Sequence, residues 1–230
     1  MAFARTTGYI KAHAGLRALN RRTISLLDQP YDLIAAVLNY CGGFLGPIQD
    51  IDELAHLVAD VRALNPRIIV EIGTHRGGTL YLWSRLAQPK ATLISIDLRG
   101  GAFGGGYSAF RIPFYKRFSR DGQKLHLIRA DSHAPSTLHM AKQLLNDQPI
   151  DLLFVDGDHT YDGVKKDWEM YSPLVRPSGL IVFHDVAGDY ADTHVKSFWD
   201  TLKINYACRE YISNPGGLYG IGVLQKAPLT

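Results

Sequence analysis

The fold is decided by the stretch Arg67-Ile-Ile-Val-Glu-Ile-Gly-Thr-His-Arg-Gly-Gly-Thr79, in which an apolar run turns through glycines into a helix-like segment. The isoleucines and the valine predict a strand that is buried on both faces. Gly73, Gly77 and Gly78 allow the backbone to turn tightly and to approach a ligand with no side chain between. The stretch therefore predicts a strand–loop–helix cradle for a phosphate or a nucleoside.

Glu71 distinguishes this turn from a dinucleotide-binding loop. The glycine spacing after Gly73 differs from that fingerprint, and a carboxylate at the mouth of the turn would repel a pyrophosphate. The acid suits a ligand with a cationic end, such as the amino and sulfonium groups of S-adenosylmethionine (SAM), whose carboxylate could meet free backbone N–H groups of the loop. A buried strand and glycine turn of any other α/β protein is the alternative interpretation.

The motif Val-Glu-Ile-Gly-Thr-x-x-Gly-Gly-Thr resembles the first motif of class I SAM-dependent methyltransferases. The resemblance implies that SAM is the cofactor.

Composition indicates a globular α/β domain. The chain has 230 residues, 46% of them hydrophobic, and a formal net charge of +3, which does not by itself call for nucleic acid. Two isolated cysteines, Cys41 and Cys208, provide neither a disulfide framework nor a zinc site, so we expect a cytoplasmic protein. No apolar run is long enough to predict a transmembrane helix.

Residues 1–49 are expected to form a helical extension that precedes a methyltransferase domain over residues 50–230. The extension carries five cations and no acid before Asp28. It could bind a membrane surface or a partner, or contact a second copy of the chain as a solvated helix.

Strands and helices alternate along the rest of the chain. A helix is expected from Asp50, with Glu53 at capping-box spacing, to Leu64. Apolar runs with acids at their ends predict further strands over residues 91–97, 124–132, 149–156 and 179–185. The pattern predicts a doubly wound, mainly parallel sheet with ligands at its carboxyl edge. Residues 209–213 and 218–225 flank Asn214-Pro-Gly-Gly217, which indicates a C-terminal hairpin.

A glycine-rich stretch, residues 99–107, is followed by phenylalanines at helical spacing among basic residues (Phe110, Phe114, Phe118; Arg111, Lys116, Arg117, Arg120). We expect a mobile lid whose arginines could meet an anionic or polyhydroxylated substrate. Basic and aromatic residues together also suit RNA, but a solvated amphipathic helix is the commoner case.

Acids and histidines gather at the ends of two expected strands. Asp156, Asp158 and His159 follow one strand, and His184 and Asp185 end the next. Carboxylates suit magnesium or manganese, and a histidine among them favours manganese, iron or zinc. Asp156 and Asp185 could instead be helix-capping acids, and His159 could simply donate to a nearby carboxylate.

Two segments extend the resemblance, Asp151-Leu-Leu-Phe-Val-Asp-Gly-Asp-His-Thr-Tyr-Asp-Gly-Val-Lys-Lys-Asp167 and Ser178-Gly-Leu-Ile-Val-Phe-His-Asp185. Together they are similar to the cephalosporin hydroxylase-like and rhamnosyl O-methyltransferase-like group of methyltransferases, over roughly residues 50–226. The resemblance implies a seven-stranded, mainly parallel sheet with an antiparallel C-terminal hairpin.

The resemblance also implies roles for individual residues. The implied metal ligands are Asp156, His184 and Asp185, and His184 departs from the family because the relatives have a carboxylate there. His159 takes the place of the general base, with Asp156 beside it as the other catalytic residue. The implied cofactor contacts are Asp97 for the ribose, Asp131 and Ser132 for the adenine side, and Glu71, Gly73 and Thr74 at the methionine end. Gly77 and Asp156 are expected as further cofactor contacts.

The sequence thus predicts a cytoplasmic SAM-dependent O-methyltransferase that acts on a hydroxyl of a small molecule or glycan. It would be assisted by magnesium or manganese, with His159 as base. The alternatives are an RNA methyltransferase and a SAM-binding protein without turnover. Nucleic acid is a less expected partner than a small-molecule or glycan acceptor. A homo-oligomer formed through residues 1–49 is also compatible with the sequence.

Overall fold

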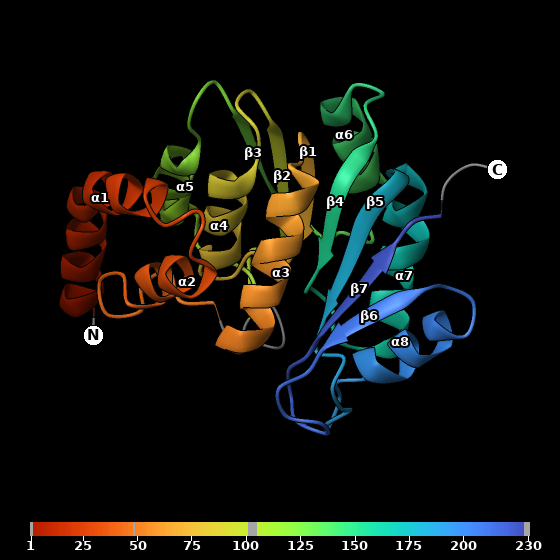
Figure 1. The fold of residues 1–230 in the computed structure, drawn as a ribbon. Helices are drawn as coiled ribbons and strands as arrows, with labels where there is room; N and C mark the ends of the chain where they lie inside the picture. Colours follow the sequence, from red (N-terminus) through yellow and green to blue (C-terminus); the bar gives the residue numbers. More distant parts are fainter. Residues whose placement is uncertain (1, 48, 101–104, 228–230) are drawn as a thin grey trace.

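A seven-stranded sheet forms the centre of the computed structural model, which describes residues 2–47, 49–100 and 105–227 (Figure 1). The strands are β1 (Ile68–Ile72), β2 (Thr92–Asp97), β3 (Lys124–Arg129), β4 (Ile150–Val155), β5 (Val175–His184), β6 (Cys208–Tyr211) and β7 (Ile221–Gln225). Their order is β3-β2-β1-β4-β5-β7-β6, with β1 to β5 parallel and β7 antiparallel to both β5 and β6. The predicted mainly parallel sheet with an antiparallel hairpin is confirmed.

Helices cover both faces of this sheet (Figure 1). The α-helices are α1 (Ala2–Ile24), α2 (Pro30–Leu38), α3 (Ile51–Leu64), α4 (Gly78–Leu86), α5 (Ile112–Tyr115), α6 (Pro135–Leu145), α7 (Tyr161–Tyr171) and α8 (Val195–Lys203). Within the described ranges, single turns of 3₁₀ helix occur at η2 (Ala109–Arg111), η3 (Lys116–Phe118) and η4 (Ser172–Leu174). None of the helices in the described residues is both long and apolar enough to span a bilayer.

Successive residues of each central strand point into different hydrophobic clusters. On β1, Ile69 packs with side chains of α1 to α4, whereas Val70 packs with side chains of α6 to α8. Val70 pairs in register with Ile94 of β2 and Leu153 of β4, and both belong to the same cluster as Val70. The sheet is therefore buried on both faces, as the continuous apolar run predicts.

The two N-terminal helices pack onto the first of these clusters. Leu16 of α1 and Leu33 and Val37 of α2 are fully buried there. The sequence predicts that residues 1–49 are helical, and α1 and α2 confirm this for the described part.

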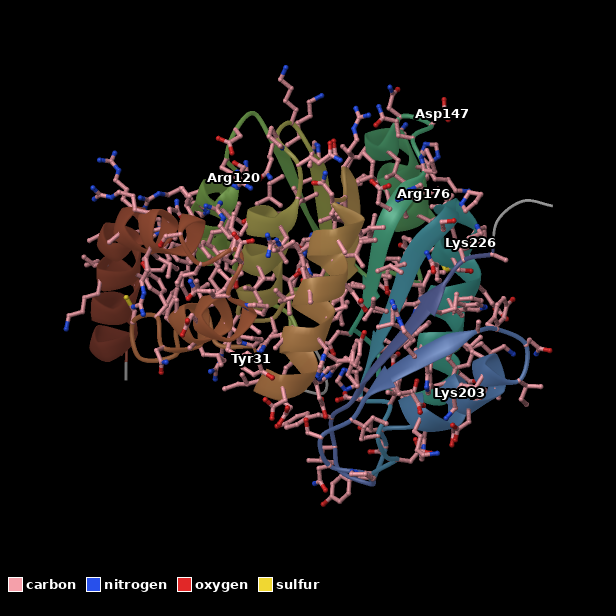
Figure 2. All side chains as sticks on the ribbon, viewed as in Figure 1. Tyr31, Arg120, Asp147, Arg176, Lys203 and Lys226 are labelled. Atoms are coloured by element: carbon pink, nitrogen blue, oxygen red, sulfur yellow. The ribbon has the colours of Figure 1, made fainter. Side chains whose placement is uncertain are left out.

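The segment predicted to be a lid is packed into the fold. Phe114 and Phe118 are fully buried, and the ring of Phe114 lies 5.1 Å from that of His13 on α1. Arg117 donates to the carbonyl oxygen of His13, and Arg120 (Figure 2) donates to that of Arg85 on α4. The lid prediction is therefore wrong for residues 109–120, whose apolar spacing reflects core packing. Residues 101–104 of the glycine-rich stretch lie outside the described residues.

Glu53 connects α3 to the C-terminal hairpin. Asp50 caps α3 by accepting hydrogen bonds from the N–H groups of Asp52 and Glu53, which confirms the predicted helix start. The Glu53 side chain is buried, and its two oxygens accept hydrogen bonds from the N–H groups of Ser213 and Gly220, both at 2.9 Å. This carboxylate thereby fixes the loop between β6 and β7, which forms part of the site described below.

Replacement of Glu53 with alanine should lower the free energy of unfolding by about 2–3 kcal/mol, because a buried backbone N–H loses its acceptor. Urea unfolding of Glu53→Ala measures this loss. Glu169→Ala is the matched control, since Glu169 is exposed and forms only an exposed pair with Lys165, and it should change stability by less than about 0.5 kcal/mol.

Candidate functional site

A cavity of about 470 Å³ opens at the carboxyl ends of the parallel strands. The strand order reverses there, because β2 lies on one side of β1 and β4 lies on the other. In open α/β sheets, ligands bind at such a switch point. Of the predicted site residues, Gly73, Thr74, Asp97, Asp131, Ser132, Asp156, His159, His184 and Asp185 line this cavity. Glu71 and Gly77 are not among the residues that line it.

The glycine loop after β1 lies directly against the end of β4. Gly73 has a φ of +90°, and a Cβ atom added there would lie 1.8 Å from the carbonyl oxygen of Asp156. The N–H of Asp156 in turn donates to the carbonyl of Ile72 at 2.8 Å. Only glycine satisfies both the backbone angle and the contact, so this residue sets the distance between the loop and the acidic strand end.

Asp97 holds two loops together at the end of β2. Its Oδ2 accepts hydrogen bonds from the N–H groups of Thr74 and His75, at 3.0 and 2.8 Å. Its Oδ1 accepts from the N–H groups of Leu98 and Gly106, at 2.7 and 3.0 Å. All four bonds are made within the chain, so the structure assigns Asp97 an organising role, and its contact with a ribose stays a prediction.

Glu71 differs from the sequence-based expectation. Its side chain is completely buried, and its Oε1 accepts a hydrogen bond from the indole N–H of Trp83 on α4, at 3.0 Å. Burial raises the pKa of Glu71 to about 8, and the nearby charge of Asp156 also raises it. The side chain is therefore mostly neutral at neutral pH, and it lies behind the cavity instead of presenting a charge to a cationic ligand.

The segment between β3 and α6 contributes a further histidine to the site. His133 lines the cavity beside Asp131 and Ser132. Its Nε2 lies 3.3 Å from Oδ1 of the fully buried Asp167, which lies on α7. The nearby Asp167 carboxylate raises the pKa of His133, although burial opposes this. His133 belongs to no local motif, and 34 residues separate it from Asp167. The sequence therefore does not show that the two side chains lie together.

Four ionisable side chains meet where β4 and β5 end. His184 Nδ1 lies 2.8 Å from Asp185 Oδ1 and 3.3 Å from Asp156 Oδ1. His159 faces the same acids, with Nε2 3.5 Å from Asp156 Oδ1 and Nδ1 3.3 Å from Asp185 Oδ2. Asp185 has a φ of +64°, which is uncommon for a residue with a side chain and is often found at functional sites. The predicted convergence of these residues at one rim is confirmed.

Opposite charges stabilise this cluster. Burial alone would raise the pKa of Asp156, but the charges of His184 and His159 hold that pKa well below its usual range. Burial favours the neutral forms of His159 and His184, yet the adjacent carboxylates outweigh burial and raise the pKa of each ring above 6.5.

The donor set of the cluster fits a divalent cation. Asp156, His184 and Asp185 each offer one ligand atom, and these atoms lie within 4.8 Å of one another. Two carboxylate oxygens and an imidazole nitrogen suit manganese at least as well as magnesium. His184 Nε2 is buried without a hydrogen-bond partner among the described residues, so the ring gains its polar contacts through Nδ1, which faces the two acids.

Aromatic and aliphatic side chains border the same end of the cavity. Tyr190 and Thr193 come from the loop after β5, and Leu218 and Tyr219 come from the loop between β6 and β7. The ring of Tyr219 lies 5.8 Å from that of His184. Sequence reasoning missed these four residues because their loops carry no recognisable motif.

The comparison with protein families agrees with this geometry. Residues 70–186, which run from β1 through the glycine loop to the end of β5, match the family model described as a methyltransferase domain. The chain belongs to this family. The match contains the glycine loop, Asp97 and the whole Asp156–His159–His184–Asp185 cluster.

An uncharacterized protein of Sinorhizobium fredii is 31% identical to this chain over 167 residues, which cover 71% of this chain and 18% of that protein. The chain spans between 18% and 50% of the length of the curated relatives that it matches.

Solved structures share the fold. An O-methyltransferase from Bacillus cereus in complex with S-adenosylhomocysteine (SAH) matches with a TM-score of 0.53 and 16% identity, over 88% of this chain and 91% of that one. MycE, a methyltransferase of the mycinamycin biosynthetic pathway in complex with Mg, SAH and mycinamycin VI, matches with a TM-score of 0.51 and 17% identity, over 75% of this chain and 49% of that one. The chain therefore shares the fold of these two methyltransferases.

Replacement of Glu71 with glutamine should change the pH dependence of stability. Because the pKa of Glu71 is raised in the folded state, the wild-type protein loses stability as the pH rises from about 4.5 to about 8, when the unfolded state ionises before the folded state. Glutamine keeps an acceptor for Trp83 and does not ionise. We expect equal stability of the two proteins near pH 4 and an advantage of a few kcal/mol for Glu71→Gln near pH 8, measured by denaturant unfolding. A constant difference across this range would contradict the buried-acid interpretation.

Proposed function

We propose that the protein is a SAM-dependent O-methyltransferase that acts on a hydroxyl group of a small molecule or glycan, with a divalent cation and with His159 as general base. The observation that carries the proposal is that Asp156, His159, His184 and Asp185 lie together at the edge of a cavity that the glycine loop also lines. Membership of the methyltransferase family supports it.

The cavity suits the cofactor in size and lining. Gly73 and Thr74 would face the methionine part, and Asp131, Ser132 and His133 would surround the adenine. The ribose would lie near Asp97, between these two groups. The B. cereus structure that shares the fold contains SAH.

Asp156, His184 and Asp185 would hold the cation. When bound, a divalent cation supplies positive charge that stabilises a developing alkoxide and helps to orient a hydroxyl-bearing substrate. MycE, which shares the fold, was solved with Mg. His184 replaces a negatively charged ligand with a neutral one, so this donor set favours manganese over magnesium.

His159 lies where a base is needed. Its ring touches both Asp156 and Asp185, and the backbone N–H of His194 donates to its carbonyl oxygen at 2.7 Å, which fixes the loop. The two carboxylates raise the pKa of the His159 ring, against the effect of burial. With a cation bound to these carboxylates their effect on the ring would be weaker, and His159 could accept the proton of the acceptor hydroxyl.

The acceptor would enter past the loops that carry Tyr190 and Tyr219. These exposed aromatic side chains can stack on a sugar or a phenol ring, and the acids beneath them disfavour an anionic group at the reacting position. Adjacent hydroxyl groups on such a ring would give two points of attachment.

Replacement of Asp185 with asparagine should remove the cation and the activity but spare the cofactor. We expect manganese binding, measured by calorimetry, to weaken by at least about tenfold, and SAH affinity to stay within about twofold of wild type. Asp162→Asn is the control, because Asp162 is exposed on α7 and is not among the residues that line the cavity. Unchanged manganese binding in Asp185→Asn would refute the ligand assignment, and full activity in excess EDTA would leave a metal-free reaction.

Replacement of His159 with alanine should lower kcat by about 10²- to 10⁴-fold, because the hydroxyl loses its base. The measurement is the release of SAH with a panel of diols, alongside manganese and SAH affinities, which should stay near wild type. If wild type binds SAM but yields no SAH with any acceptor, a cofactor-binding protein without turnover becomes the better description.

A further inference from the structure

The segment between α2 and α3 reaches into the cavity from the N-terminal part of the chain. Pro47 and Gln49 line the cavity. A Cβ atom added to Gly78 would lie 2.2 Å from the carbonyl oxygen of Leu45 and 2.5 Å from Cδ of Pro47. The segment therefore lies directly on the first residue of α4, beside the glycine loop.

Gln49 offers an unused hydrogen-bond acceptor at this place. Its Nε2 donates to Asp156 Oδ2 at 3.4 Å. Its Oε1 is buried and has no hydrogen-bond partner among the residues that the structure describes. The opposite amide orientation would place Oε1 against the carboxylate of Asp156, so the bond to Asp156 fixes which atom remains free. A buried acceptor without a partner costs free energy, unless a ligand supplies the donor.

The position of Gln49 identifies the part of the ligand that it would meet. The N-terminus of α4 favours the carboxylate of an amino acid, and the α-ammonium group is bonded to the same carbon as that carboxylate. The ammonium carries three donors and needs acceptors. Glu71, which the sequence suggests for this task, is buried behind the cavity and hydrogen-bonded to Trp83. Gln49 Oε1 lines the cavity as an acceptor that has no partner among the described residues, and it could serve this group instead.

We propose that Gln49 Oε1 accepts a hydrogen bond from the α-ammonium group of the methionine part of SAM. This inference rests on the proposed function. Through its Nε2, the same side chain holds Asp156, so Gln49 connects recognition of the amino-acid end of the cofactor to the acidic end of β4. The N-terminal segment then supplies part of the cofactor site.

The test compares SAH with its deaminated analogue, in which a keto acid replaces the amino acid. Both are titrated by calorimetry into wild type and into Gln49→Met, which keeps the side-chain length but removes both polar atoms. We expect the variant to bind SAH about ten- to a hundredfold more weakly than wild type, because it loses a hydrogen bond to a charged group. Its affinity for the deaminated analogue should stay within about twofold, which also shows that the variant is folded.

Two further variants complete the test. Gln49→Glu keeps an oxygen acceptor and should retain most of the preference for SAH over the analogue. Gln143→Met, on the exposed surface of α6, should bind both ligands like wild type.

The proposal would be overturned if Gln49→Met weakened the binding of SAH and of the analogue equally, or weakened the binding of neither. An unchanged SAH affinity with a raised KM for the acceptor would assign Oε1 to the acceptor instead. Failure of wild type to bind SAH would remove the proposed function itself.

Discussion

The contact between Gly73 and the carbonyl oxygen of Asp156 is the constraint on which the site depends. It brings the loop after β1 against the end of β4, at the point where the strand order reverses. A side chain at position 73 would separate the two, since a Cβ atom would lie 1.8 Å from that oxygen. The glycine loop and the acidic cluster therefore border one cavity, and a methyl donor held by the first would lie beside the groups of the second.

Much of this arrangement could be predicted from the sequence, because it depends on local patterns. Buried parallel strands have continuous apolar runs, and their carboxyl ends must lie at one edge, so the convergence of Asp156, His159, His184 and Asp185 followed from strand order alone. The start of α3 at Asp50 and the hairpin around Asn214 have equally local signals. The family resemblance added the antiparallel order of β6 and β7.

The remaining features depend on side-chain direction and on contacts distant in sequence. On β1, residues alternate between the two faces, and the pattern does not reveal that Glu71 points toward Trp83. His133 meets Asp167 across 34 residues, and Gln49 meets Asp156 across 107. Phe114 and Phe118 have the spacing of an amphipathic helix, but their apolar side packs against α1 and α4, so a lid and a core element look the same in sequence.

Asp97 connects the two loops beside the cavity through hydrogen bonds made within the chain. Its carboxylate accepts hydrogen bonds from four backbone N–H groups in the segments after β1 and β2. Ordering a loop during association costs about 1–2 kcal/mol of conformational entropy for each residue that becomes fixed. Hydrogen bonds to Asp97 fix the backbone of Thr74, His75 and Gly106 on this side of the cavity. Binding of a nucleoside therefore requires little rearrangement there, and the conformational entropy lost on binding is smaller.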